Sequence, residues 1–213
     1  LSLRNAYTFS MKTVFSSSST FQRFNHLWLM LISFLAHGIL SQSIVSPDFS
    51  FQPKDRIALV GDTLLEREQT WGYLETAITA RHPAHDLVFR NFAWSGDNPL
   101  GQSRASFDWS KPKEQWVQRI TRELEAFEPT VLLLGYGMAS SLEHPNQTRA
   151  FRDELVALIE ACRAVSKKPA DLRVVLLSPM RHEAMGAPLP DPSDHNRALV
   201  RYVRTLRALA LEQ

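Results

Sequence analysis

The residues best suited to chemistry in this sequence are a threonine hydroxyl and an imidazole, each placed just beyond an apolar run. Thr63 carries a hydroxyl that an adjacent base can deprotonate for attack on a carbonyl carbon; alternatively, this hydroxyl caps the helix that follows it. His182 is a candidate base or a substrate-contacting side chain. Beside it, Arg181 can bind an anionic or sugar group, or pair with Glu183. Whether these groups act together depends on the elements that position them.

Four apolar runs that end near the candidate residues predict the strands of a mostly parallel sheet. The runs are residues 56–61, 86–92, 130–135 and 172–178. Strands that alternate with helices indicate βαβ units, in which helices cover both faces of the sheet. Ligands bind at the carboxyl ends of such strands, so a site is expected in the four loops that follow them.

Apolar side chains at helical spacing predict four helices between and after these strands. The four stripes are Trp71, Leu74 and Ile78; Trp116, Ile120, Leu124 and Phe127; Phe151, Leu155, Leu158, Ile159 and Cys162; and Leu199, Val203, Leu206 and Ala210. The single cysteine falls on the third stripe, so it is expected to be buried as a small hydrophobic residue. Residues 51–213 are therefore predicted to form one α/β domain.

The loops after the four strands carry a series of short motifs. They read, in order, GDTLLER, NFAWSGD, GYGMASS and SPMRHE. In this order and on these strands they resemble the sequence blocks of the SGNH (GDSL-type) hydrolases, over residues 54–213. The residues of these motifs are most similar to those of an exported branch found in planctomycete-type bacteria. The resemblance implies a three-layer α/β/α, flavodoxin-like fold, and a hydrolase of acyl or acetyl esters, including esters on carbohydrate.

The resemblance also implies a role for one residue in each of the first three loops. Thr63 takes the position of the nucleophilic serine, and Gly96 that of a glycine whose N–H joins the oxyanion hole. Ala139 takes the position of an asparagine that donates a further hydrogen bond, which alanine cannot supply. Loss of one oxyanion donor costs roughly 10²–10³ in rate, and the threonine methyl restricts and crowds the hydroxyl. An impaired or inactive hydrolase is therefore expected.

The family's base lies in a late Asp-x-x-His block that follows a fifth strand. The late candidate here is His195, but its spacing from Asp191 is one residue too long. The same segment also fits a helix start, with Asp191 as the cap, Pro192 at the first position and Asp194 reaching back. His182 is the second candidate base. Because the fifth strand and its block would follow the last residue, we expect a C-terminally incomplete domain whose fourth strand lies at the sheet edge.

Residues 1–50 have the features of an N-terminal extension with an export signal. Met11 is the expected start, basic residues follow it, and residues 27–40 form an apolar run that ends before small residues. The run is about fourteen residues long, short of the roughly 20 needed to cross a bilayer. We expect an exported protein, periplasmic or extracellular, with transient membrane contact through the signal. An uncleaved signal would act as an anchor, and a buried N-terminal helix is the third alternative.

Composition and spacing exclude several other classes of protein. A formal net charge of +2 with scattered basic residues gives no reason to expect a nucleic-acid partner. Metal-ligand spacing and a phosphate-binding glycine loop are both missing from the sequence, so no metal or other cofactor is expected. The alternative to an esterase is a non-catalytic module that binds glycans or another partner on the same fold. Substrate contacts are assigned to Asp62, Arg181 and Tyr136, while Trp94 fits either sugar stacking or core packing.

Overall fold

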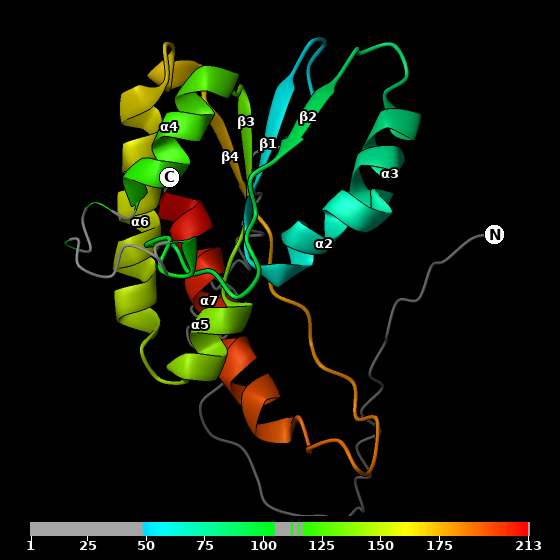
Figure 1. Ribbon diagram of the computed structural model, residues 1–213, viewed down its shortest axis with the longest axis vertical. Coiled ribbons are helices and arrows are strands. Elements are labelled where there is room, and N and C mark those ends of the chain that lie inside the picture. Colours follow the sequence, from blue (N-terminus) through cyan, green and yellow to red (C-terminus); the bar gives the residue numbers. More distant parts are fainter. Residues whose placement is uncertain (1–48, 105–111, 113–114, 116, 213) are drawn as a thin grey trace, which may run out of the picture. The chain divides into compact units, whose positions relative to one another are not determined.

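Four parallel strands form the centre of the part of the chain that the computed structural model describes, namely residues 49–104, 112, 115 and 117–212 (Figure 1). The strands are β1 (Arg56–Gly61), β2 (Val88–Asn91), β3 (Val131–Gly135) and β4 (Arg173–Leu176). Their order across the sheet is β2-β1-β3-β4, and all neighbours are parallel. All four predicted strands are confirmed, and β4 lies at an edge of the sheet, as expected.

The predicted ends of the strands are less accurate than their positions. The second run was expected to begin at Asp86, but β2 begins at Val88 because Asp86 has a positive φ of 51°, which belongs to a turn. The expected signal segment, its Met11 start, Trp116 and the last residue lie outside the described residues. No helix in the described ranges is long and apolar enough to cross a membrane.

Helices cover both faces of the sheet. One face carries α2 (Thr63–Trp71) and α3 (Tyr73–Arg81); the other carries α4 (Val117–Phe127), α6 (Thr148–Val165) and α7 (Ser193–Glu212) (Figure 1). The short helices are α5 (Met138–Glu143) and a 3₁₀ turn, η3 (Pro169–Asp171). Side chains of a strand alternate between faces, so Ala58 and Val60 pack with α4, α6 and α7. Ile57 and Leu59 pack on the face of α2 and α3. The predicted three-layer α/β/α arrangement is confirmed.

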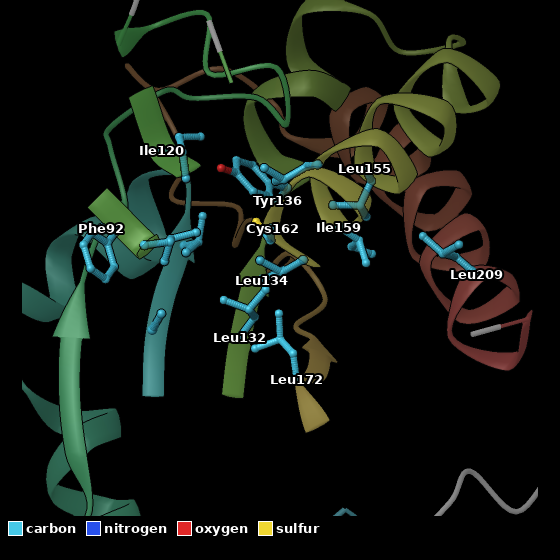
Figure 2. Packing of buried hydrophobic residues seen from close by; sticks show 14 of the residues in the cluster. Phe92, Ile120, Leu132, Leu134, Tyr136, Leu155, Ile159, Cys162, Leu172 and Leu209 are labelled. Atoms are coloured by element: carbon cyan, nitrogen blue, oxygen red, sulfur yellow. The ribbon is translucent and has the colours of Figure 1, made fainter. Parts of the chain in front are cut away.

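The larger of the two cores lies between the sheet and α4, α6 and α7. Figure 2 shows Leu132 and Leu134 of β3 beside Ile159 and Cys162 of α6. Burial raises the pKa of the Cys162 thiol to about 12, so this group is a protonated, apolar filler at neutral pH. The expected burial of the cysteine is confirmed.

Two of the predicted helical stripes contain errors. Trp71 was expected to face the core with Leu74 and Ile78, but its side chain is 62% exposed. Gly72 adopts a left-handed conformation (φ 61°) that ends α2, so Trp71 and Ile78 stand on different helices and share no face.

In α7 the buried positions include Leu206 and Leu209, whereas Ala210, expected in the stripe, is exposed. Because Leu209 buries the larger apolar side chain, the helix turns this residue inward and its alanine neighbour outward.

The start of α7 also differs from the expected cap. The Asp191 carboxylate accepts the backbone N–H of Ser193 at 2.9 Å and also the Ser193 hydroxyl, as a capping residue would. However, α7 begins at Ser193, so Pro192 precedes the helix and its carbonyl accepts the first intrahelical N–H, that of Asn196. Asp194 does not reach back, because its carboxylate pairs with Arg197 one turn ahead. The capping role of Asp191 is confirmed, and the placement of Pro192 and Asp194 was wrong.

Candidate active site

The loops after all four strands meet at the carboxyl edge of the sheet. The Gly96 N–H, in the loop after β2, donates to the Thr63 hydroxyl after β1. The Met138 N–H, after β3, donates to the carboxylate that precedes Thr63. The His182 ring, after β4, contacts the Met138 sulfur, with Nε2 and Sδ 3.1 Å apart. Parallel strands place their ends on one edge, and this topology gathers motifs that lie far apart in the sequence.

Two glycines allow the first and third loops to approach each other closely. A Cβ atom on Gly61 would lie 2.3 Å from the carbonyl oxygen of Gly135, and one on Gly135 would lie 2.8 Å from a Leu65 methyl carbon. The same Gly135 carbonyl accepts the backbone N–H of Asp62 at 2.9 Å. Glycine is therefore required at Gly61, where a Cβ would meet backbone and push β1 and β3 apart, whereas a Cβ at Gly135 would force the Leu65 side chain of α2 to shift.

Asp62 is a buried carboxylate that organises the site. Its side chain accepts the backbone N–H groups of Met138 at 3.1 Å and Ala139 at 3.4 Å, and the residue is only 2% exposed. Burial raises its pKa to about 6; the N–H donors oppose this shift, and the nearby Asp97 carboxylate adds to it. The sequence assigned Asp62 to substrate contact, which stays a prediction; in the structure the carboxylate holds the loop after β3.

The Thr63 hydroxyl points into the loop after β2. Its oxygen accepts the Gly96 N–H at 2.9 Å and lies 3.2 Å from the Ser95 hydroxyl oxygen. Thr63 is the first residue of α2, whose capping position is Asp62. In the structure, then, the hydroxyl bonds across to a neighbouring loop, and the alternative in which it caps its own helix was wrong. An N–H that donates to this oxygen favours its deprotonated, nucleophilic form.

The loop that presents Gly96 is held in place from both sides. Asn91 donates to the Leu65 carbonyl of α2 at 2.5 Å and accepts the Ala93 N–H at 2.8 Å. Further along, the buried pair of Arg104 and Asp97 joins a guanidinium to a carboxylate at 2.7 Å. These bonds fix the backbone around Gly96, which has a φ of 68° and so suits glycine.

Ala139 lies near the site but contributes only its backbone. Its N–H donates to Asp62, and its methyl group has no hydrogen-bond donor to offer. In the described residues, the Thr63 hydroxyl has the Ser95 hydroxyl and the Gly96 N–H, both in the loop after β2, as hydrogen-bond partners.

The two candidate bases form a separate cluster beyond Met138. His195 Nε2 lies 2.9 Å from the Ser141 hydroxyl oxygen, and the His195 and His182 rings meet edge to face with centroids 4.7 Å apart. Asn196 holds His182 through two hydrogen bonds of 2.9 Å to its backbone. Neither ring is among the hydrogen-bond partners of Thr63 in the described part of the chain. The structure thus brings Thr63 and Gly96 together, but not the histidines with Thr63.

The remaining substrate-contact residues differ in their exposure. Tyr136, assigned to substrate contact from the sequence, is 1% exposed and packs in the larger core (Figure 2). Trp94 is 49% exposed, in the same loop as Gly96. Arg181 is exposed and lines a groove along α7. Among the described residues, no group of three or more histidine, cysteine or carboxylate side chains could hold a metal ion.

Two hydroxyl groups at this edge were missed from the sequence. Ser95 lies beside the Thr63 hydroxyl, and its position just before Gly96 was the available signal. Ser141 is the hydrogen-bond partner of His195, 54 residues away in the sequence. Nothing in the local pattern could have paired these two residues, because α5 and α7 come into contact only in the tertiary structure.

The described unit has the fold of the SGNH (GDSL-type) hydrolases. A solved structure described as a GDSL-like lipase from Parabacteroides merdae superposes with a TM-score of 0.55 at 16% identity, covering 78% of this chain and 77% of its own. An α/β hydrolase, LAE5, from the metagenome of Lake Arreo matches with a TM-score of 0.51 at 16% identity, over 75% of this chain and 74% of its own.

TesA is a third such structure, with a TM-score of 0.50 at 20% identity, over 74% of this chain and 73% of its own. No protein-family model and no curated protein matches the sequence. At these identities the likeness defines the fold, and the function is argued below from the site.

Proposed function

We propose that this protein is an SGNH-type ester hydrolase of low activity, acting on acyl or acetyl esters, including esters on carbohydrate. The observation that carries the proposal is the Thr63 hydroxyl, which faces the Gly96 N–H at 2.9 Å across the carboxyl ends of β1 and β2. The loop motifs, similar to an exported planctomycete-type branch, add support from the sequence. The similarity in fold to a GDSL-like lipase is consistent with this class of reaction.

The proposed reaction is acyl transfer through Thr63. The threonine oxygen bonds to the ester carbonyl carbon, and its proton passes to a base as the tetrahedral intermediate forms. The backbone N–H groups of Thr63 and Gly96 then donate to the oxyanion. The alcohol leaves with a proton, and water releases the acid from Thr63. Because Gly96 already donates to the hydroxyl, its N–H lies close to where the negative charge develops.

Low activity follows from two features of the same edge. Ala139 supplies no side-chain donor to the oxyanion, and loss of one such donor costs roughly 10²–10³ in rate. The base is assigned to His182 or His195, and both contact other partners: Met138 and Ser141, respectively. A hydroxyl without a hydrogen-bonded base is a weak nucleophile at neutral pH.

Hydrolysis of 4-nitrophenyl acetate tests the proposal directly. We expect the wild-type chain to exceed the uncatalysed rate, Thr63→Ala to return it to that rate, and Thr63→Ser to raise it because the crowding methyl is removed. Thr205→Ala is the matched control: the Thr205 hydroxyl bonds only its own helix, through the Arg201 carbonyl, and its loss should change nothing. Turnover that survives Thr63→Ala would disprove the assignment of the nucleophile.

A glycan-binding module without turnover is the second candidate, favoured by the exposed Trp94. Its indole is 49% exposed in the loop that also carries Ser95 and Gly96, and exposed aromatic faces stack well on sugars. This function requires that an acetylated glycan binds, that no acetate is released, and that Trp94→Ala weakens binding. Acetate release by the wild type, lost in Thr63→Ala, would favour the hydrolase instead.

Export is proposed from the sequence of residues 1–50 together with the substrate class. The apolar run at residues 27–40 supports a cleaved signal, and a glycan ester is a substrate found outside the cytoplasm. Fractionation of cells that express the full chain tests this, with N-terminal sequencing of the product. Recovery of uncleaved protein in the soluble cytoplasm would contradict it.

A further inference from the structure

Ser95 carries a hydroxyl beside Thr63 that no step of the proposed reaction uses. Its oxygen lies 3.2 Å from the Thr63 hydroxyl oxygen, the same atom that accepts the Gly96 N–H at 2.9 Å. Ser95 is exposed, so an incoming substrate can reach it. Two groups of the loop after β2 that are able to donate a hydrogen bond therefore surround the atom that would attack the ester.

The other serine hydroxyl bonded in this loop has no proton left for a substrate. Ser103 donates to the Gly96 carbonyl oxygen at 2.7 Å, and a carbonyl oxygen can only accept. The Ser95 hydroxyl differs, because its hydrogen-bond partner among the described residues is another hydroxyl, that of Thr63, which can donate or accept. Of these two serines, Ser95 is the one whose proton can be redirected.

The backbone on both sides of Ser95 is fixed by hydrogen bonds. The Trp94 N–H donates to the Gly61 carbonyl at the end of β1 at 2.9 Å, and the Asp97 N–H donates to the Trp94 carbonyl at 3.2 Å. The buried Asp97 carboxylate is itself paired with Arg104 at 2.7 Å. A donor that is held in place before the reaction costs little reorganisation when the charge develops.

The negative charge moves during acyl transfer, and the Ser95 hydroxyl can follow it. Once the Thr63 oxygen bonds the ester carbon, it becomes a weak acceptor, and the charge lies on the former carbonyl oxygen, which is attached to the same carbon. The Gly96 N–H has a direction set by the backbone, whereas a hydroxyl proton rotates to suit its acceptor. Ser95 can therefore donate to the oxyanion whichever of the two hydroxyls donates to the other in the free protein.

The loop after β3 supplies no side-chain donor to the oxyanion. The side chain of Ala139 is a methyl group, and its N–H donates to the buried Asp62 carboxylate at 3.4 Å. We propose that Ser95 is a catalytic residue whose hydroxyl donates to the oxyanion together with the Gly96 N–H. This inference rests on the proposed function and names a side-chain donor for the same site.

Hydrolysis of 4-nitrophenyl acetate by the wild type and by Thr63→Ser tests the proposal. We expect Ser95→Ala to lower kcat about 10- to 100-fold in both, as loss of a hydrogen bond to a charged group implies. KM should change little, because this bond forms in the transition state. Ser95→Thr keeps the hydroxyl and should retain most of the rate. Ser166→Ala is the matched control: the Ser166 hydroxyl accepts the Lys168 N–H at 3.2 Å, in the segment that leads into β4, and its loss should leave kcat unchanged.

Diethyl 4-nitrophenyl phosphate distinguishes a donor from a nucleophile. In its reaction the Thr63 oxygen bonds phosphorus, the hydroxyl proton passes to a base, and 4-nitrophenolate leaves. Peptide mapping by mass spectrometry should find the diethylphosphoryl group on Thr63, and Ser95→Ala should slow its attachment. A phosphorylated Ser95 would overturn the donor role, because Ser95 would then be the nucleophile.

The same kinetics separate failure of this inference from failure of the hydrolase proposal. Hydrolysis that is present in the wild type or Thr63→Ser but unchanged by Ser95→Ala would overturn the role of Ser95 alone. Hydrolysis no faster than the uncatalysed rate in both proteins would overturn both proposals.

Discussion

The carboxyl edge of the sheet contains two clusters of reactive groups that differ in how they are built. The first cluster, Thr63 with Ser95 and Gly96, consists of hydroxyl and backbone groups fixed by strand ends and by the buried Arg104–Asp97 pair. The second, Ser141 with His182 and His195, consists of imidazoles beside an open cavity, joined by contacts between α5 and α7.

The two clusters together contain the groups that a hydroxyl-based hydrolase needs, but in separate places. Met138 lies between them: its N–H bonds Asp62 and its sulfur touches His182. The comparison teaches that a hydroxyl group and imidazoles can share one edge of a sheet without being hydrogen-bonded to each other. Variants that alter one cluster and spare the other can test this separation.

The largest effect is expected from restoring a donor to the first cluster. Ala139→Asn adds a side-chain amide at the position where the resemblance places one, and should raise ester hydrolysis by about 10²–10³. The rate with 4-nitrophenyl acetate measures it. Ala139→Val, which adds bulk without a donor, should give no gain. An unchanged rate in Ala139→Asn would show that this edge lacks the geometry of an oxyanion site.

Close packing under the first cluster predicts the next largest effect. Gly61→Ala places a Cβ 2.3 Å from the Gly135 carbonyl oxygen and should lower the free energy of unfolding by about 3 kcal/mol. Gly186→Ala, in the segment beside the second cluster, meets no atom within 4 Å and should cost only about 1 kcal/mol for its φ of 75°. Urea denaturation measures both. Similar losses of stability in the two variants would mean that both regions tolerate an added methyl group equally well.

The carboxylate that supports the first cluster should make stability depend on pH. Burial raises the pKa of Asp62 from its ordinary value of 3.8 to about 6 in the folded protein, so the folded state binds more protons between these values. Its contribution to the free energy of unfolding therefore falls as pH rises from about 4 through 6, by on the order of 2–3 kcal/mol. In urea denaturation at pH 4.5 and 7.5, Asp62→Asn should make this decrease smaller; part of it remains because burial also raises the pKa of Asp97. The exposed Asp171→Asn should retain the full decrease, and an equally large decrease in Asp62→Asn would contradict the assignment.

The smallest effect distinguishes Ser141 of the second cluster from the adjacent Ser140. Ser141→Ala removes the hydroxyl that bonds His195 and should cost about 1 kcal/mol. Ser140→Ala should be neutral or stabilising, because the buried Ser140 hydroxyl oxygen has no hydrogen-bond partner. Thermal unfolding compares them. A larger loss of stability in Ser140→Ala than in Ser141→Ala would show that the Ser141 bond contributes nothing to stability.

The sequence determined the sheet, because continuous apolar runs can be buried only between two layers of helices. All of β3 and all of β1 except Arg56 are buried, and the glycines that end these strands allow their close approach at the site edge. Thr63 and Gly96 could be placed on that edge from strand order alone, since parallel strands end on one side.

Only the tertiary structure decided which polar groups became partners. Asp62 turned inward to the loop after β3, Tyr136 entered the core, and His195 bonded Ser141 instead of Thr63. The physical reason is that local spacing fixes the side of a helix or strand on which a residue lies, but not the element that packs against it. Partners that are tens of residues apart are selected by packing and by the cost of leaving buried polar groups unsatisfied.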